Sequence, residues 1–339
     1  MARRLGLAVV SSDALTILRT RRGRGFSYLD PSGRKVDAAR RREIEALGLP
    51  PAWEDVVIAA DPQAHLQALG RDAKSRMQYR YHERWSAVRD AVKAERLRMF
   101  GRALPRIRAA VERDMKRALD DPRAVAATAV RLIDRQLVRV GGEVYARQGT
   151  RGASTLTKRN ALVGARDVKL RYRAKAGKKV ELRLRDEALK RRLRRLATQR
   201  APQTDGRLFA YRGTDGKWRS LKAPQINSWL AEAAKAPVTA KDFRTFGGSS
   251  LALALLCDAE PDTRNGEWTA PARRRATAGV MRDVAERLRN TPAVTRSSYV
   301  HPSIVEAFER DELDCSFLRG RMRMGLSREE TALMRFLEN

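Results

Sequence analysis

The sequence predicts an α+β protein of two domains. A small N-terminal domain built on an antiparallel β-sheet is expected over residues 1–83, and a mainly α-helical domain with a small three-stranded sheet over residues 84–339. Alternating strand patterns and turn signals fill the first part of the chain, whereas amphipathic helical patterns dominate from Trp85 onward. The 339 residues are enough to give two domains proper cores.

The N-terminal elements follow from local signals. Residues 25–36 contain an Asp-Pro-Ser-Gly turn between two alternating runs, which predicts a hairpin. Residues 38–47 predict a short helix that ends at Gly48, and residues 56–60 predict a buried strand. Residues 1–20 carry no clear functional signal.

Residues 67–82 interleave cations with aromatic and amide side chains. Cations contact phosphates, while Gln and Tyr side chains reach base edges or stack on them, so this segment suits a strand that faces DNA. The candidate DNA contacts are Arg76, Gln78, Tyr79 and Tyr81. The alternative is an ordinary edge strand with half-buried tyrosines.

The second domain is predicted from helical periodicity and capping residues. The first expected helix covers residues 85–97, and a second helical segment follows that is broken or kinked at Pro105. A third helix begins after its capping residue Asp121, and another begins after Thr239. Further helices are expected over residues 186–199, 224–235, 270–288 and 304–308. Residues 169–184 predict a hairpin with lysines at its tip, and residues 146–154 a flexible loop.

The charge balance indicates a polyanionic partner. Lys and Arg number 71 against 40 Asp and Glu, for a net charge of +31. Such an excess favours DNA or RNA over an anionic membrane surface. No apolar run approaches the roughly 18–20 residues of a membrane span. The first residues lack an apolar stretch long enough for a signal peptide.

The metal-ligating residue types are sparse. Cys257 and Cys315 cannot form a disulfide framework and are expected to be buried thiols. The three histidines have no zinc-ligand spacing. We therefore expect an intracellular protein with no metal site that faces nucleic acid.

The stretch from Thr239 to His301 carries the candidate chemistry. Thr239 is a good N-cap, which places Lys241 and Arg244 on one face of an early helical turn. A phosphate bound between them would relieve their repulsion, although they could also be two solvated residues. Tyr299 follows downstream; tyrosine has a pKa of about 10, which cationic neighbours lower.

Lys241-x-x-Arg244 followed by Asn290 and Tyr299 resembles the end of the catalytic domain of type IB DNA topoisomerases, in the poxvirus-type branch that bacteria also carry. The segments Leu-Pro-Pro-Ala-Trp at 49–53, Gly-Arg-Asp at 70–72 and Gln-Tyr-x-Tyr-His at 78–82 resemble the N-terminal domain of the same branch. Val-Arg-Val-Gly-Gly-Glu-Val-Tyr at 138–145 resembles the segment of its first catalytic arginine. The resemblance implies the fold shared by tyrosine recombinases and type IB topoisomerases.

The resemblance implies a role for each site residue. Tyr299 attacks a DNA phosphate, and Arg139 and Arg244 bind its non-bridging oxygens with Lys241 in support. Lys175 protonates the leaving oxygen, with Lys178 as the fallback because Ala174 stands where the family usually has Gly. Lys178 is otherwise expected to contact DNA. Asn290 replaces the family's usual His, so it can donate a hydrogen bond but not exchange a proton. Arg139 alone would also fit a helix-dipole cap, and His301 is interpreted as structural.

The implied activity is relaxation of supercoiled double-stranded DNA through a 3′-phosphotyrosyl intermediate, without ATP, metal or another cofactor. The implied protein is a monomer that clamps duplex DNA in the cytoplasm, at the bacterial nucleoid, with no obligatory protein partner. The rivals are a tyrosine recombinase or integrase and a non-catalytic basic DNA-binding protein. A metal-dependent nuclease has weaker support, from Asp120-Asp121 and Asp311-Glu312.

Overall fold

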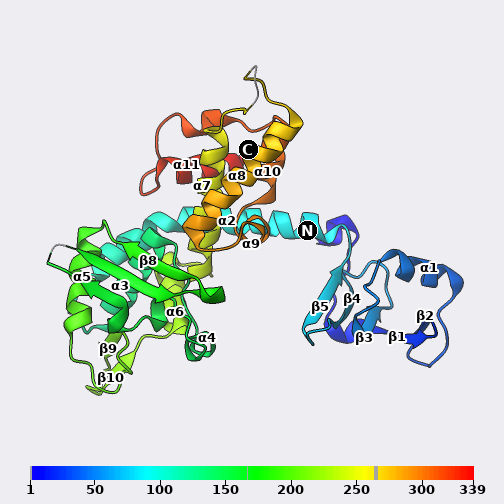
Figure 1. The fold of residues 1–339 in the computed structure, drawn as a ribbon, viewed down its shortest axis with the longest axis horizontal. Coiled ribbons are helices and arrows are strands. Elements are labelled where there is room, and N and C mark those ends of the chain that lie inside the picture. Colours follow the sequence, from blue (N-terminus) through cyan, green and yellow to red (C-terminus); the bar gives the residue numbers. More distant parts are fainter. Residues whose placement is uncertain (1, 166, 263–265) are drawn as a thin grey trace. The chain divides into compact units, whose positions relative to one another are not determined.

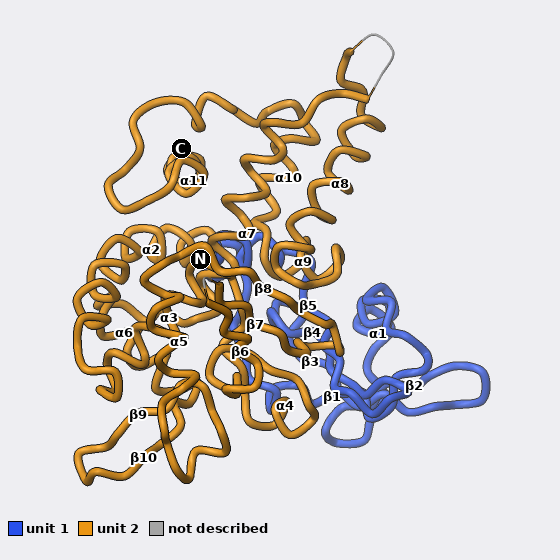
Figure 2. The backbone as a smooth tube through the Cα atoms, turned by 60° about the vertical axis from the view of Figure 1, so that its left-hand side comes forward, with its two compact units in different colours: residues 1–93 blue, residues 94–339 orange. Residues whose placement is uncertain are grey.

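The computed structural model describes residues 2–165, 167–262 and 266–339. The chain forms two compact units, residues 1–93 and residues 94–339 (Figure 2). Helix α2, Trp85–Asp114, begins in unit 1 and ends in unit 2. No described helix is long and apolar enough to cross a membrane.

Unit 1 is built on a five-stranded antiparallel sheet with the strand order β2-β1-β3-β4-β5. Its elements are β1 Leu15–Arg22, β2 Gly25–Leu29, α1 Ala38–Ala46, β3 Glu54–Ala59, β4 Leu66–Arg71 and β5 Met77–Tyr81, preceded by the 3₁₀ turns η1 Ala2–Leu5 and η2 Ser12–Ala14. Ile44 of α1 packs with Ile17, Val56 and Ile58 of the sheet, so one apolar face is buried.

The predicted hairpin over residues 25–36 is present only in short form. After the turn the chain makes one antiparallel bridge, between Leu29 and Lys35, and the Val36 amide donates to the Tyr28 carbonyl oxygen at 3.1 Å. The main partner of β2 is β1. The segment of residues 67–82 is likewise two strands, β4 and β5, joined at residues 72–76. Sequence periodicity shows a strand but not its partner, which non-local packing decides.

Unit 2 is mainly helical, which confirms the predicted fold class. Its helices are the C-terminal part of α2, α3 Pro122–Gln136, α4 Glu143–Arg147, α5 Glu187–Thr198, α6 Ala223–Ala234, α7 Ala240–Cys257, α8 Ala270–Leu288, α9 Pro292–Ser298, α10 Pro302–Glu309 and α11 Arg328–Glu338. The three-stranded sheet has the order β6-β7-β8, and α3, α5 and α6 gather around it while α7 to α11 form a second group (Figure 1).

The strands of unit 2 are short. The three-stranded sheet consists of β6 Ala161–Val163, β7 Val168–Arg173 and β8 Lys179–Arg183, and a separate pair consists of β9 Ala210–Arg212 and β10 Trp218–Ser220. β7 and β8 form the predicted hairpin, with Leu170 opposite Leu182 and Tyr172 opposite Val180. These four side chains are buried, so the hairpin has a fixed register against the core.

The predicted break at Pro105 is wrong, because α2 continues through this residue as one helix of 30 residues. A proline inside a helix removes one hydrogen bond and crowds the preceding turn. Phe100, Leu104 and Ile107 on the same stretch are at most 1% exposed. Burial of that apolar face offsets the local cost.

The expectation of two cysteine thiols is also wrong, because Cys257 and Cys315 form a disulfide. Cys257 is the last residue of α7, and Cys315 begins the 3₁₀ turn η6, Cys315–Leu318. Their Cα atoms lie 5.4 Å apart although 58 residues separate them in sequence. The bridge therefore closes a covalent ring that contains α8, α9 and α10.

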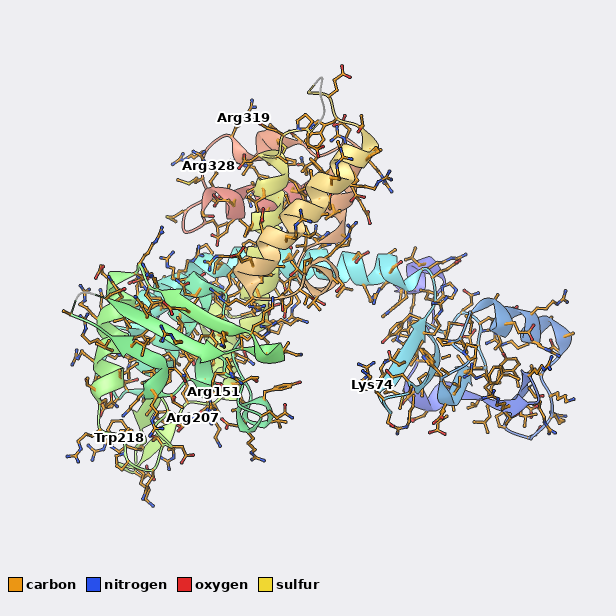
Figure 3. The ribbon with its side chains drawn as sticks, viewed as in Figure 1. Lys74, Arg151, Arg207, Trp218, Arg319 and Arg328 are labelled. Atoms are coloured by element: carbon orange, nitrogen blue, oxygen red, sulfur yellow. A yellow bond between two sulfur atoms is a disulfide. The ribbon has the colours of Figure 1, made fainter. Side chains whose placement is uncertain are left out.

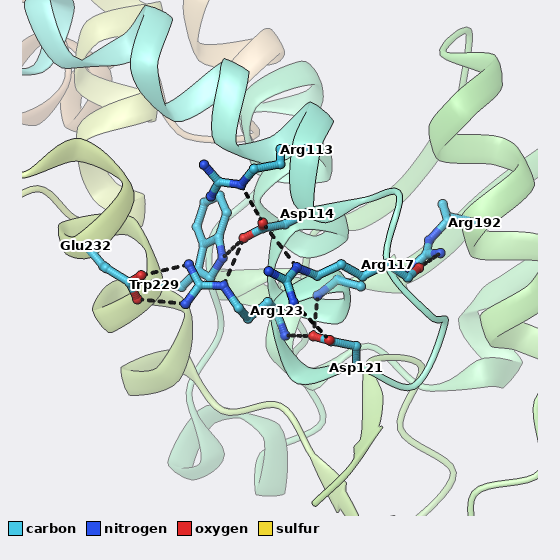
Figure 4. Close-up of polar contacts among 9 residues, drawn as sticks. Arg113, Asp114, Arg117, Asp121, Arg123, Arg192, Trp229 and Glu232 are labelled. Atoms are coloured by element: carbon cyan, nitrogen blue, oxygen red, sulfur yellow. Dashed lines mark hydrogen bonds and ion pairs between the residues drawn. The ribbon is translucent and has the colours of Figure 1, made fainter.

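A balanced cluster of charges joins α2, α3 and α6 (Figure 4). Its members are Arg113, Asp114, Arg117, Asp121, Arg123, Trp229 and Glu232. Fully buried Asp114 accepts hydrogen bonds from Arg113, Arg123 and Trp229 at 2.9, 3.1 and 3.0 Å. Arg123 also pairs with Glu232 at 2.7 Å. Each buried charge in this cluster thus has an opposite partner.

Candidate active site

A cleft of about 310 Å³ in unit 2 collects most of the predicted site residues. It is lined by Arg139, Val140, Gly141, Gly142, Tyr145, Thr150, Arg151, Lys175, Ala240, Lys241, Arg244 and Tyr299. Five of these carry a positive charge and none is acidic. We call this site the cationic cleft; its composition suits an anion.

The N-terminus of α7 presents Lys241 and Arg244 to the cleft. The predicted cap is confirmed, because Thr239 is the N-cap residue and its amide and hydroxyl donate to the Asp242 carboxylate at 2.7 and 2.9 Å. Arg96 of α2 donates to the same carboxylate at 2.8 Å. This anchors the first turn of α7, so the two cations project from a fixed base.

Arg244 is held among backbone carbonyl groups. Its side chain is buried, and it donates to the carbonyl oxygen of Leu137 and, at 2.9 Å, to that of Leu288. Its Nε atom is buried and has no hydrogen-bond partner. Burial first, and then the charge of Arg139, lower the pKa of Arg244. The guanidinium keeps one unsatisfied donor.

Arg139 and Asn290 meet through their side chains. Arg139 Nη2 donates to Asn290 Oδ1, and Nη1 lies 3.5 Å from the Arg289 carbonyl oxygen. Asn290 is 6% exposed and its Nδ2 has no hydrogen-bond partner. The carbonyl oxygens at the end of α3 accept instead from Arg244, Arg287 and Arg289. Those contacts favour a ligand-binding role for Arg139 over the helix-dipole alternative.

Tyr299 ends α9 and lies beside Arg244, whose Cζ is 4.7 Å from the centroid of the tyrosine ring. Burial raises the pKa of Tyr299, but the charges of Arg244, Arg139 and Lys241 more than offset it, so the pKa lies below its ordinary value. A lower pKa makes the phenolate, the nucleophilic form of tyrosine, accessible at lower pH.

Two glycines of α7 bring the Tyr299 and Arg139 segments together. A Cβ atom on Gly248 would lie 3.0 Å from the Tyr299 carbonyl oxygen, and one on Gly247 would lie 2.8 Å from Leu137. Tyr299 and Leu137 can pack this closely against α7 because Gly248 and Gly247 have no side chain. Leu137 leads to Arg139, so α7 sets the spacing between the arginine and the tyrosine.

The two lysines at the tip of the β7–β8 hairpin point to different partners. Lys175 lines the cleft, and its Nζ lies 5.5 Å from the centroid of the Tyr145 ring. Lys178 is absent from the lining, and its Nζ donates to the carbonyl oxygen of Asn290. The geometry therefore favours Lys175 over the fallback as the residue that reaches a bound phosphate.

The sequence reasoning missed Tyr145, Thr150 and Arg151, which complete the wall of the cleft. Arg207, which Figure 3 labels together with Arg151, pairs through its guanidinium with Glu143 of α4 at 2.7 Å. The amide of Arg151 donates to the Arg173 carbonyl oxygen at 2.7 Å, which ties the loop to the hairpin. Tyr145 could have been predicted, because it is the last residue of the segment 138–145 that contains Arg139.

Arg289 was also missed. It is the C-cap of α8 with φ 55°, and burial lowers its pKa to about 10. Its Nη1 donates to the Gln136 carbonyl oxygen, which joins the ends of α8 and α3 beneath Arg139 and Asn290. A positive φ at an arginine carries no sequence signal, so only the structure identifies this position.

The predicted DNA-contacting residues of unit 1 lie on β5 and the turn before it. Tyr79 and Tyr81 are 51% and 38% exposed, and their rings stack with a centroid distance of 6.2 Å. Arg76 and Gln78 both bond to Asp72, at 2.6 and 2.8 Å. The exposed tyrosines present the face that the sequence analysis anticipated, while Asp72 partly neutralises the arginine. Whether these residues contact DNA stays a prediction.

His301 is 4% exposed, and its Nδ1 shares a hydrogen bond of 2.6 Å with Ser303. Its amide donates to Ser249, whose hydroxyl also donates to the Tyr299 carbonyl oxygen at 3.2 Å. His301 thus helps to hold the backbone after the tyrosine. Over the described residues, no group of three or more His, Cys, Asp and Glu side chains could hold a metal ion.

Comparison with known proteins identifies the family. The model of the eukaryotic DNA topoisomerase I catalytic core matches residues 82–314, and that of the bacterial DNA topoisomerase IB N-terminal domain matches residues 25–72. A DNA topoisomerase 1B of Acanthamoeba polyphaga mimivirus is 28% identical over 292 residues, which cover 84% of each chain. These matches name topoisomerases rather than recombinases. The chain therefore belongs to the type IB DNA topoisomerase family.

Proposed function

We propose that the protein relaxes supercoiled duplex DNA by transient cleavage of one strand, with Tyr299 as the nucleophile. The observation that carries the proposal is the cationic cleft: Tyr299, with a lowered pKa, shares it with five cations and no carboxylate. Such a site stabilises the negative charge that builds on a phosphate under attack. The family membership supplies the DNA substrate.

The proposed chemistry is a reversible transfer of one phosphodiester. Tyr299 Oη, having released its proton to water, attacks phosphorus and forms a 3′-phosphotyrosyl bond, while the bond from phosphorus to the 5′ oxygen breaks. Lys175 supplies the proton that the 5′ oxygen takes up. Because the new bond retains the energy of the old one, resealing by the 5′ hydroxyl needs no ATP, and the cations take the place of a metal ion.

The remaining site residues bind the phosphate. Arg139 and Arg244 hold the non-bridging oxygens, with Lys241 in support. The free Nδ2 of Asn290 and the free Nε of Arg244 are buried donors that a phosphate oxygen would satisfy. On unit 1, Arg76, Gln78, Tyr79 and Tyr81 contact the duplex, and one protein molecule suffices. The proposal includes a cytoplasmic location at the nucleoid.

The test is relaxation of a supercoiled plasmid in EDTA without ATP, together with capture of the covalent protein–DNA adduct. We expect Tyr299→Phe to abolish both. Tyr145→Phe is the matched comparison, because it removes the other tyrosine hydroxyl of the cleft. An adduct that persists in Tyr299→Phe and disappears in Tyr145→Phe would reassign the nucleophile. DNA binding without any adduct in the wild type would instead support a non-catalytic protein.

A further inference from the structure

The tip of the β7–β8 hairpin is a closed turn that carries Lys175 and Lys178 on its two sides. The Ala174 amide donates to the Lys178 carbonyl oxygen at 2.8 Å, and the Gly177 amide donates to that of Ala174 at 3.1 Å. Ala176 and Gly177 both have positive φ, 63° and 72°. These bonds close the tip into one turn, from which the two lysine side chains reach different partners: the ring of Tyr145 and the carbonyl oxygen of Asn290.

Lys178 is fixed by the junction between α8 and α9, because its ammonium donates to the Asn290 carbonyl oxygen. The bond joins the hairpin to the residue that contacts Arg139. It therefore connects the elements that carry Lys175, Asn290 and Arg139.

Asn290 is the centre of this arrangement. Its amide donates to the Ala285 carbonyl oxygen at 2.8 Å, its Oδ1 accepts from Arg139, and its carbonyl oxygen accepts from Lys178. Only Nδ2 is left without a partner in this buried residue. These contacts fix the direction in which the free donor points.

We propose that Lys178 is a positioning residue. By binding the main-chain carbonyl of Asn290, which is not itself among the residues that line the cleft, it keeps the Asn290 side chain in place beside Arg139, from which Nδ2 can donate to a bound phosphate. This inference rests on the proposed function of the cationic cleft. In this role Lys178 gives up no proton during the reaction, in contrast to Lys175.

The first experiment measures the single-turnover rate of adduct formation on a duplex oligonucleotide. We expect Lys178→Met to slow it about tenfold, the scale of one lost hydrogen bond to a charged group. Lys178→Arg, which can still donate to the carbonyl, should recover most of the rate. Lys179→Met removes the same charge from the next residue, which is exposed at the start of β8, and is the matched control. Equal losses in Lys178→Met and Lys179→Met would overturn the proposal.

The second experiment separates positioning from proton transfer. With sulfur in place of the bridging 5′ oxygen, the leaving thiolate needs no proton, so Lys175→Ala should recover most of its rate. Lys178→Met should stay about tenfold slow, because Asn290 is misplaced with either leaving group. Full recovery of Lys178→Met on the sulfur substrate would make Lys178 a general acid and overturn the proposal.

A double-mutant cycle tests the partner. Adding Lys178→Met to Asn290→Ala should cost no further rate, because the side chain that Lys178 positions is already gone. An undiminished further loss would overturn the assignment to Asn290. Absence of any adduct in the wild type would instead overturn the proposed function, and these variants would not then be compared.

Discussion

Two arginine clusters of unit 2 use the same residue type in opposite ways. In the balanced cluster, Asp114 and Glu232 form ion pairs with the surrounding arginines and neutralise their charge. In the cationic cleft, Arg139 and Arg244 donate to carbonyl and amide oxygens, and Arg244 also bonds to the Tyr299 side chain, so neither arginine pairs with a carboxylate there. Uncharged acceptors fix the direction of a guanidinium without cancelling its charge. The first cluster therefore holds helices together, and the second keeps its charge for an anion.

The ionisation of the central groups follows the same contrast. Burial raises the pKa of Asp114. The hydrogen bonds from Arg113 and Trp229 and the charge of Arg123 lower the pKa by more than burial raises it, so the carboxylate stays charged. In the cleft the group surrounded by cations is Tyr299, and its pKa also falls. The same electrostatic effect thus stabilises a structural anion in one place and lowers the pKa of the proposed nucleophile in the other.

The largest effect is expected from Arg244→Ala in the cleft. Loss of a buried donor that holds the transition-state charge should slow adduct formation by about 10³-fold. Single-turnover cleavage of a duplex oligonucleotide measures this. A loss under tenfold, in a protein whose thermal unfolding shows that it is folded, would mean that this arginine is structural like those of the balanced cluster.

Asp114→Asn should affect stability rather than catalysis. It leaves Arg113 and Arg123 without their buried counter-charge, and breaking such a pair costs about 3 kcal/mol of the free energy of unfolding. Urea unfolding measures this cost, with Asp215→Asn as the control, because the Asp215–Arg219 pair is exposed and should contribute under about 1 kcal/mol. A slower adduct-forming step at a temperature where Asp114→Asn is folded would contradict the separation of the two clusters.

Thr150→Asp should place a carboxylate among the cations of the cleft and so make it resemble the balanced cluster. Thr150 lines the cleft between Tyr145 and Arg151, so a carboxylate here would neutralise nearby cations and repel the DNA phosphate. We expect DNA affinity to fall about tenfold, the scale of one charge acting across a few ångströms near a protein surface. Thr150→Asn has nearly the same shape and also lacks the hydroxyl that bonds to the Tyr145 carbonyl oxygen. Equal affinities of the two variants would show that the absence of acidic residues is immaterial.

The smallest expected effect is a shift in the pH dependence of cleavage. In the proposed reaction the attacking species is the tyrosine anion, and the pKa of Tyr299 is lowered because the cations outweigh the effect of burial. The rate should therefore rise with pH and level off at a lower pH than for a tyrosine of ordinary pKa. Lys241→Gln removes one of the charges that lower this pKa, so its profile should move to higher pH. A profile that is unmoved, or moved to lower pH, would remove Lys241 from the electrostatic environment of Tyr299.

Sequence patterns predicted the elements whose signals are local. The cap at Thr239 and the α3 start at Asp121 and Pro122 are chemical features of a few adjacent residues, and both are confirmed. The β7–β8 hairpin and α8 were predicted because an alternating or helical apolar pattern extends along the whole element. The family resemblance, confirmed by the comparisons, supplied the grouping of Arg139, Lys175, Arg244 and Tyr299 in advance.

Features that depend on non-local contacts could not be predicted. The course of α2 through Pro105 depends on burial against distant segments. The β1–β2 hairpin, in contrast, turns at Gly23 and Arg24 and is local, but residues 1–20 were not recognised as containing its first strand. The disulfide joins residues 58 apart, and intracellular proteins usually keep their thiols reduced. The contact between Lys178 and Asn290 joins two loops that lie 112 residues apart, and no periodic pattern in the sequence indicates that such loops are neighbours. Local chemistry thus predicted the residue types of the site but not its supporting contacts.

The ring closed by Cys257 and Cys315 has a mechanical consequence. Tyr299 lies inside it, so in the proposed covalent intermediate a DNA end would pull on a closed ring of chain. The force would reach α7 by two covalent routes, backward through α8 and forward through α10 and the disulfide. Reduction of the disulfide would leave only the first route.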